Sequence, residues 1–359
     1  MDSKSRRGVV VLSGLIAIVA VTGGVSAEEV TSETSPQLKQ ALQRFPDADA
    51  NGDGVLTQTE ARVYREKMNP RRAPAGRNGA NQGKPAATYA NVHYGPDERQ
   101  VLDVYLADSK QPTPLLIYIH GGGFVGGDKG SIAGNVVARC HEAGVSVAAI
   151  HYRFVTTDPF PVPQQDAARA VQFLRSQAGE WNLDPQRFGA YGGSAGAGLS
   201  MWLGFHDDLA DPDSDDPVAR ESTRLKAVGS IGGQSTYDPQ VIKAWIGGRA
   251  YEHPSIYKCY NITSIDEIAD PKLQPVYDEV SAIKHLTADD PPVFMLYSEA
   301  DAPLPADARP GQGIHHPIFG HKLKAEMDRL GIESRYVHTS ERNQGAADML
   351  EYLLRWLKA

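Results

Sequence analysis

A serine held between glycines is the first feature of this chain that could do chemistry. Ser194 lies at the centre of the pentapeptide Gly-Gly-Ser-Ala-Gly at 192–196. It follows an apolar stretch at 188–191, expected to be a strand, and precedes a small-residue stretch at 197–205, expected to be a helix. Glycines suit this turn because a side chain would clash with the neighbouring strand and helix. The spacing therefore predicts a serine hydroxyl that projects above the end of a strand, as a nucleophile requires.

Two more stretches support nucleophilic chemistry. The tetrapeptide His-Gly-Gly-Gly at 120–123 follows an expected strand upstream of Ser194. Glycines let backbone N–H groups approach a substrate closely and stabilise a developing oxyanion. Downstream, Glu299-Ala300-Asp301 follows another expected strand and offers carboxylates that could orient a histidine.

Apolar runs that alternate with helical patterns must position these residues. The first two expected strands, 89–94 and 101–106, alternate around a turn and predict an antiparallel pair. Later expected strands are 115–119, 145–150, 188–191, 225–231, 293–297 and 333–338, with expected helices at 136–143, 163–178, 197–205, 318–330 and 346–357. This order predicts an α/β fold, a doubly wound and mostly parallel sheet covered on both faces. The stretch 237–291 is expected to be a cap over the site.

The N-terminal part of the chain predicts separate units. Residues 1–27 combine a positive start, a short apolar run and a small-residue cleavage site, which predicts a signal peptide and a periplasmic or secreted protein. An uncleaved anchor is the alternative. Residues 28–68 are expected to form a small helical unit, and 69–87, rich in Pro, Gly, Arg and Asn, a flexible linker before a domain at 88–359.

The stretch 49–60 fits the twelve-residue calcium loop of an EF-hand. The expected Ca²⁺ ligands are Asp49, Asn51, Asp53, the Val55 carbonyl, Thr57 and Glu60, with Gly54 at the sharp turn. The ion would be structural, and no cofactor is expected for catalysis. Because EF-hands usually pair, the single loop either pairs with a partner or caps itself.

Composition limits the remaining function classes. The 359 residues are 41% hydrophobic and 22% charged, with a net charge of −8, which argues against a nucleic-acid partner and a basic membrane-binding face. After signal cleavage, no stable membrane insertion is expected. Two cysteines, Cys140 and Cys259, allow one disulfide or two buried thiols.

The motifs at 120–123, 192–196 and 297–301, with Trp-Asn-Leu-Asp-Pro-Gln-Arg at 181–187, resemble those of an α/β-hydrolase. The closest likeness is to carboxylesterases of the hormone-sensitive-lipase type and to feruloyl/acetyl-xylan-esterase-like proteins. The resemblance covers about 88–359. It implies the following site: Ser194 as nucleophile, the amides of Gly122, Gly123 and Ala195 as oxyanion hole, and Asp301 as the acid that orients a histidine.

The histidine departs from the family pattern. The resemblance would place it after the last strand, where this chain has Gln344. A glutamine cannot accept the serine proton. The other candidates are His338, in the expected last strand, and His315 or His316, in the loop after Asp301. His316 and His338 are the tentative predictions.

Two functions follow. One is an exported serine hydrolase that cleaves small-molecule or polysaccharide esters, with acetyl or feruloyl groups as examples. The alternative is a catalytically weakened hydrolase-fold protein that binds carbohydrate or a partner. The intact Ser194 motif favours the first and Gln344 favours the second.

Overall fold

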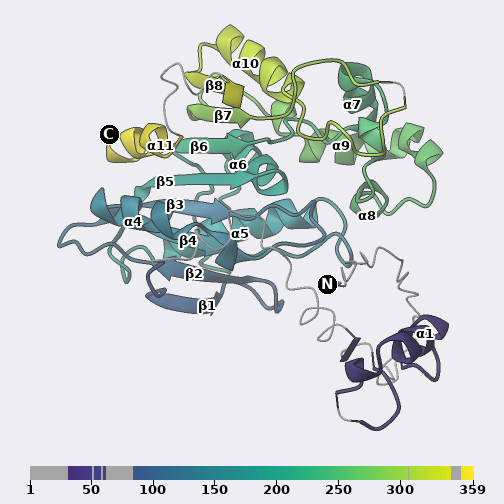
Figure 1. Ribbon diagram of the computed structural model, residues 1–359. Coiled ribbons are helices and arrows are strands. Elements are labelled where there is room, and N and C mark those ends of the chain that lie inside the picture. Colours follow the sequence, from purple (N-terminus) through teal and green to yellow (C-terminus); the bar gives the residue numbers. More distant parts are fainter. Residues whose placement is uncertain (1–30, 51, 58–59, 62–83, 306, 341–348) are drawn as a thin grey trace, which may run out of the picture. The chain divides into compact units, whose positions relative to one another are not determined.

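The computed structural model describes residues 31–359, except 51, 58–59, 62–83, 306 and 341–348. The chain divides into two compact units, 1–79 and 80–359, and each is described by itself (Figure 1). The predicted signal peptide and most of the predicted linker lie outside the described residues. Within the described ranges, no helix combines the length and apolar character needed to cross a bilayer.

The first unit is a helix followed by the Asp/Gly-rich loop. Helix α1 (Pro36–Arg44) begins at Ser35, whose Oγ accepts a hydrogen bond from the Leu38 N–H, and the short 3-10 helix η1 (Pro46–Ala48) follows it. Both helices have a Pro in the first turn. Proline is tolerated there because the N–H group that it lacks would have no hydrogen-bond partner within the helix. A small core buries Leu38, Ala48, Leu56 and Ala61.

The Asp/Gly-rich loop of this unit forms hydrogen bonds with residues 31–32, which precede α1. The Ser32 N–H donates to the Leu56 carbonyl at 2.8 Å, and the Leu56 N–H donates to Ser32 Oγ at 2.9 Å. An isolated bridge joins Thr31 to Thr57 beside these bonds. The backbone of the loop therefore has an extended partner within the same unit.

The second unit contains an eight-stranded sheet in the order β1-β2-β4-β3-β5-β6-β7-β8. Its strands are β1 (Tyr89–His93), β2 (Val101–Tyr105), β3 (Thr113–Ile119), β4 (Ser146–Ile150), β5 (Leu183–Gly193), β6 (Ala227–Ile231), β7 (Val293–Tyr297) and β8 (Ser334–His338). The first two pairings, β1 with β2 and β2 with β4, are antiparallel, and all later neighbours are parallel. The predicted antiparallel pair and mostly parallel sheet are confirmed.

Helices cover both faces of the sheet, as expected for strands that are apolar on both sides. One buried cluster packs α4 (Gly134–Glu142) and α11 (Met349–Lys358) against the sheet. The other packs α5 (Val162–Ser176), α6 (Ala195–Phe205) and α10 (Ile318–Leu330). The fold is that of an α/β-hydrolase.

A group of short helices extends the second cluster. The stretch after β6 folds into α7 (Pro239–Ile246), η3 (Ala250–Glu252), α8 (Ile256–Cys259), η4 (Ile265–Ala269), η5 (Pro271–Leu273), α9 (Gln274–Val280) and η6 (Ala282–Lys284). Figure 1 shows α7, α8 and α9 grouped at one end of the sheet. These helices lie within the stretch 237–291, which the sequence predicts to be a cap, and their buried residues belong to the main core.

The two cysteines lie in different parts of this unit. Cys140 belongs to α4 and Cys259 to α8, and both are buried free thiols. Burial raises the pKa of each thiol to about 12. Of the two alternatives left by the sequence, the structure has two separate thiols rather than a bridge.

Candidate active site

Ser194 lies on a sharp turn between β5 and α6. Its backbone has φ 52° and ψ −120°, a region that ordinary residues rarely occupy. The Ser194 N–H donates to the Ile231 carbonyl of the neighbouring strand at 2.9 Å, which holds the turn against β6. A Cβ atom at Gly192 or Gly196 would collide with the Ile119 carbonyl of β3. Glycine is therefore required at both positions because the Ile119 carbonyl leaves no room for a side chain.

His315 supplies the missing histidine. Its Nε2 lies 2.8 Å from Ser194 Oγ, and its Nδ1 lies 3.3 Å from Oε1 of Glu299. Glu299 follows β7, and His315 lies in the loop between β7 and α10. Serine hydroxyl, imidazole and carboxylate thus form a chain of contacts in the order that nucleophilic activation requires.

The loop that carries His315 is tied down on both sides of it. Before it, Gln234 Nε2 donates to the Ile314 carbonyl at 2.5 Å. After it, His316 accepts from the Ile318 N–H at its Nδ1 and donates from Nε2 to the Ala302 carbonyl at 3.0 Å. Both nitrogens of the His316 ring are therefore used to close the loop. The tentative assignment of His316 as base is corrected to His315.

The other two predicted members are also corrected. His338 donates from Nε2 to the backbone carbonyl of Glu299 at 2.8 Å, because the end of β8 lies beside the end of β7. Asp301 contacts Nε2 of His321 on α10 at 2.7 Å and has a side chain 49% exposed. The acid that meets His315 is Glu299, two residues earlier. Gln344 lies outside the described residues.

Sequence reasoning could not separate these neighbours. His315 and His316 are adjacent, so their distances from Ser194 along the sequence differ by one residue and cannot show which of them is the base. Glu299 and Asp301 are two apart in a loop, where the alternation of a strand no longer decides direction. Only the fold of the loop at 303–317 selects one member of each pair.

The glycine loop after β3 faces Ser194. Gly122 has φ 123° and Gly123 has φ 61°, conformations that favour glycine. A Cβ atom at Gly121 would lie 2.6 Å from the Gly193 carbonyl. Gly122, Gly123 and Ala195 all line the cavity that contains Ser194 and His315. The three predicted oxyanion residues are therefore placed together at the nucleophile.

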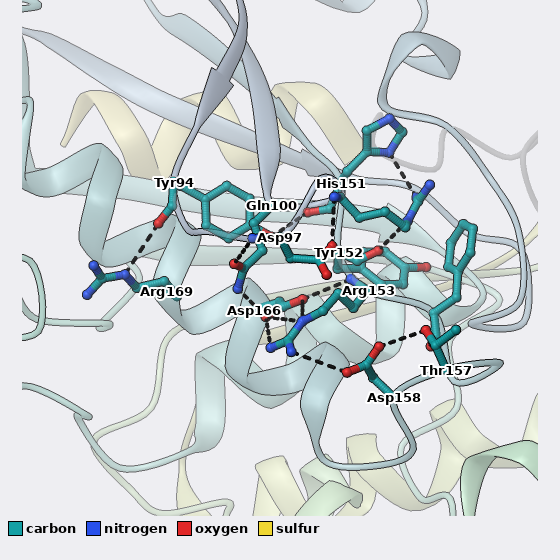
Figure 2. A network of polar contacts seen from close by, with 12 residues as sticks. Tyr94, Asp97, Gln100, His151, Tyr152, Arg153, Thr157, Asp158, Asp166 and Arg169 are labelled. Carbon is teal, nitrogen blue, oxygen red and sulfur yellow. Dashed lines mark hydrogen bonds and ion pairs between the residues drawn. The ribbon is translucent and has the colours of Figure 1, made fainter. Parts of the chain in front are cut away.

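A network of polar contacts joins Arg153, Asp166 and Gln100 next to Tyr152 (Figure 2). Arg153 donates to Asp166 of α5 through Nε at 2.9 Å and Nη2 at 2.7 Å, and the Asp166 residue is only 1% exposed. Gln100 Nε2 donates to the same carboxylate at 2.8 Å. A bidentate guanidinium fixes the orientation of its partner more firmly than a single contact does. The chain at 151–158 is thereby anchored to α5.

The network reaches the glycine loop through Tyr152. The Tyr152 hydroxyl donates to the His120 carbonyl at 2.9 Å, and the two rings stack with centroids 4.5 Å apart. Arg99 Nε donates to the Tyr152 carbonyl at 2.9 Å. Burial lowers the pKa of His120 to about 4 and that of His151 also to about 4. Both rings are therefore neutral at pH 7, and His120 holds the glycine loop in place through these contacts.

The cavity at Ser194 has a volume of about 400 Å³. Its wall is mainly aromatic and aliphatic: Phe124, Phe160, Tyr237, Ile242, Tyr251, Ile256 and Tyr260. Most of these residues come from the stretch 237–291, so this stretch forms much of the cavity wall. Such a wall accepts an apolar acyl group better than a charged one.

A second, wider cavity of about 700 Å³ adjoins the first and shares His253 and Ile314 with it. Its wall is more polar and includes Glu299, Arg309 and Gln312. Burial, with the nearby His315 ring, lowers the pKa of His253. The neutral His253 ring therefore stands between an apolar and a polar compartment.

Comparisons with known proteins agree with this geometry. A family model described as BD-FAE matches residues 102–309. The chain is 26% identical over 237 residues to the probable carboxylic ester hydrolase LipM of Mycobacterium tuberculosis, covering 64% of this chain and 52% of that protein. It is 28% identical over 193 residues to the ethyl acetate hydrolase of Pseudomonas putida, covering 52% of this chain and 55% of that protein. The chain spans about half the length of these curated relatives.

Among solved structures, the fold is similar to one described as a truncated form of a carbohydrate esterase from gut microbiota. The TM-score is 0.59 at 21% identity, and the match covers 78% of this chain and 100% of that chain. Fold and site together define an α/β-hydrolase in which Ser194, His315 and Glu299 lie in contact. The chain belongs to the BD-FAE family. The family match contains Ser194 and Glu299 and ends before His315.

Proposed function

We propose that this protein hydrolyses carboxylic esters through a covalent acyl-enzyme on Ser194. The observation that carries the proposal is the 2.8 Å contact between Ser194 Oγ and His315 Nε2 at the floor of an apolar cavity. A hydroxyl is a weak nucleophile until a base within hydrogen-bond reach accepts its proton. The ester-hydrolase names of the curated relatives support the same reaction class.

In the first half-reaction, Ser194 Oγ attacks the ester carbonyl carbon while His315 Nε2 takes the hydroxyl proton. The carbonyl oxygen becomes an oxyanion, which the N–H groups of Gly122, Gly123 and Ala195, residues that line the same cavity, would stabilise. Glu299 stabilises the imidazolium through His315 Nδ1. His315 then returns the proton to the leaving alcohol, and the C–O bond breaks.

In the second half-reaction, a water molecule replaces the alcohol. His315 takes a proton from the water, which attacks the acyl carbon, and the Ser194–acyl bond breaks as the proton returns to Ser194. The products are a carboxylic acid and the free enzyme. The steps proposed here involve only side chains and backbone groups of this chain and water, and a calcium ion in the first unit would have a structural role.

The alternative function, a weakened hydrolase that only binds a ligand, depended on Gln344 in place of a histidine. His315 makes a histidine at position 344 unnecessary, because it contacts Ser194 from a different loop. A strained backbone at Ser194 is costly to maintain, and a binding protein has no need of it.

For the substrate, we propose an ester with an acyl part of modest size and a larger, polar alcohol part, such as an acylated saccharide. The cavity of about 400 Å³ would take the acyl group, and the polar cavity of about 700 Å³ would take the alcohol. The solved relative described as a carbohydrate esterase makes acylated saccharides the first substrates to test.

The test compares hydrolysis of p-nitrophenyl acetate, butyrate and octanoate, methyl ferulate and acetylated xylan by the native chain and by Ser194→Ala. We expect Ser194-dependent turnover that is highest for acetyl, butyryl or feruloyl esters. Retention of all activity in Ser194→Ala, or no turnover of any ester by the native chain, would overturn the proposal. Turnover of the small esters without turnover of acetylated xylan would reject the proposed saccharide substrate but would still support an ester hydrolase.

We also propose export to the periplasm or the medium, supported by the signal-like pattern at 1–27. Cell fractionation with antibody detection tests it. A protein that stays in the cytoplasm, with residues 1–27 uncleaved by N-terminal sequencing, would contradict it.

A further part of the proposal is Ca²⁺ binding by the loop at 49–60. Asp49 accepts from the N–H groups of Gly52 and Gly54 at 2.8 Å each, and Gly54 has φ 82°, as the sharp turn of a calcium loop requires. The Asn51 position lies outside the described residues. The pairing of Leu56 with Ser32 supplies an extended neighbour to the loop within one chain, which favours self-capping.

Calorimetric titration of the full chain with Ca²⁺ tests this site. We expect one equivalent to bind and Glu60→Gln with Asp49→Asn to lose it, while ester turnover stays unchanged. Equal binding by the native chain and this double variant would remove the calcium site.

A further inference from the structure

A cluster of three metal-ligating side chains lies at the far end of α6 from Ser194. His206 caps the C-terminus of α6, Glu279 belongs to α9, and His285 caps η6. One ring nitrogen of each histidine and one carboxylate oxygen all lie within 4.8 Å of one another. None of these residues takes part in the ester chemistry. We propose that they bind a divalent transition-metal ion, Zn²⁺ by preference.

The hydrogen bonds around the two rings orient them for binding. Nδ1 of His206 donates to the Asp207 carbonyl at 2.9 Å, which leaves Nε2, 3.5 Å from Glu279 Oε1, as its ligand atom. Nε2 of His285 donates to the Glu279 carbonyl at 2.7 Å, which leaves Nδ1 as its ligand atom. A metal-bound histidine commonly donates its second N–H to a carbonyl or carboxylate in this way.

The distances suit a small ion. With Zn²⁺ to ligand distances of about 2.0–2.1 Å, tetrahedral neighbours are roughly 3.3–3.5 Å apart, close to the His206–Glu279 separation. The two imidazole rings are 4.5 Å apart between centroids and tilted by 42°. All three residues are half-buried, so their ligand atoms are within reach of solvent.

The ligand types and the local charge decide the ion. Two imidazoles and one carboxylate match Zn²⁺, whereas Ca²⁺ and Mg²⁺ prefer sites built from oxygen. The C-terminus of α6 carries partial negative charge, which favours a cation at His206. The positions left open by three protein ligands would be filled by water.

The expected consequence is a clamp between α6 and the cap. Trp202 of α6 already donates from Nε1 to the Glu279 carbonyl at 2.7 Å, and its ring packs 4.5 Å from the His206 ring. A metal ion would add a second connection at the same place. Because an eleven-residue helix spans about 16 Å, the ion would lie too far from Ser194 to act on the ester.

The experiment is a Zn²⁺ titration of the metal-free full chain by calorimetry and by melting temperature. We expect one equivalent to bind and the melting temperature to rise by roughly 5 °C. Co²⁺ in place of Zn²⁺ should give visible absorption typical of mixed nitrogen and oxygen ligands. His285→Gln, which keeps a donor for the Glu279 carbonyl, and Glu279→Gln should each weaken binding at least tenfold.

His93→Ala, an exposed histidine on β1, is the matched control and should bind Zn²⁺ as the native chain does. Melting of each variant without metal reports whether it folds. If folded His285→Gln and Glu279→Gln bind Zn²⁺ as tightly as the native chain, or if the native chain binds none, the cluster is an ordinary His–Glu ion pair and the proposal is wrong.

Discussion

The Nε2 atom of His315 lies 2.8 Å from the Oγ atom of Ser194, although the two residues are 121 positions apart. Replacing His315 by Ala should lower kcat for p-nitrophenyl acetate by about 10³–10⁴-fold, because Ser194 would lose its base. His321→Ala, a histidine on the neighbouring helix, is the control and should keep most of the activity. Near-native turnover in His315→Ala would show that another group accepts the proton.

Glu299, not Asp301, should be the acid whose removal matters. Glu299→Gln removes the charge that stabilises the His315 imidazolium and should lower kcat by about 10²–10⁴-fold with little change in KM. Asp301→Asn affects only the exposed contact with His321 and should change kcat by less than about threefold. Steady-state kinetics on both variants checks the assignment, and a larger effect in Asp301→Asn would reverse it.

The buried pair of Arg153 and Asp166 should be important for stability. Asp166→Ala removes the bidentate partner of Arg153, leaves it only the more exposed Asp158, and should reduce the free energy of unfolding by about 3–5 kcal/mol. Asp158→Ala removes a more exposed contact of the same Arg153 and should cost less than about 1 kcal/mol. Urea unfolding measures both changes, and equal losses would contradict a special role for Asp166.

The neutral, buried His120 should make the protein less stable in acid. Its pKa is about 4 in the folded chain and about 6.5 when unfolded, so the unfolded state binds the proton first. The stabilisation is complete above pH 6.5 and is lost as the pH falls toward 4, by up to about 3 kcal/mol.

The check is urea unfolding between pH 7 and 4.5 for the native chain and for His120→Gln. The variant should be less stable at pH 7 and should lose less stability across this range. His151, whose pKa is lowered in the same direction, remains in both chains and leaves part of the slope. Parallel pH profiles would show that His120 does not titrate between the two states.

Gly196→Ala should prevent a native turn at Ser194. The added methyl group would overlap the Ile119 carbonyl, which is backbone and cannot rotate away. We expect lost activity together with a large fall in melting temperature. Gly179→Ala, where nothing lies within 4 Å of the added carbon, should be close to neutral. A stable and fully active Gly196→Ala would contradict the packing described for the turn.

Local sequence determined the fold class and the place of the nucleophile. Apolar strands covered by helices favour a parallel sheet with two buried faces, and the glycines at 192–196 allow a tight turn at Ser194 that larger side chains would block. The glycines at 121–123 could be placed at the same edge because parallel strands present their carboxyl ends together. These inferences succeed because each segment involved, a strand or a glycine motif, can be recognised from its own local sequence.

Tertiary structure decided which histidine and which acid meet Ser194. The loop at 303–317 has no periodic pattern, and its path is set by long-range contacts such as Gln234 with the Ile314 carbonyl and His316 with the Ala302 carbonyl. These contacts turn His315 toward Ser194, whereas His316 bonds the backbone of its own loop. In the same way His206 is far in sequence from Glu279 and His285, and only the packing of the cap on α6 brings it to them. Spacing along the chain carries no information on such approaches, because they depend on where several loops meet in space.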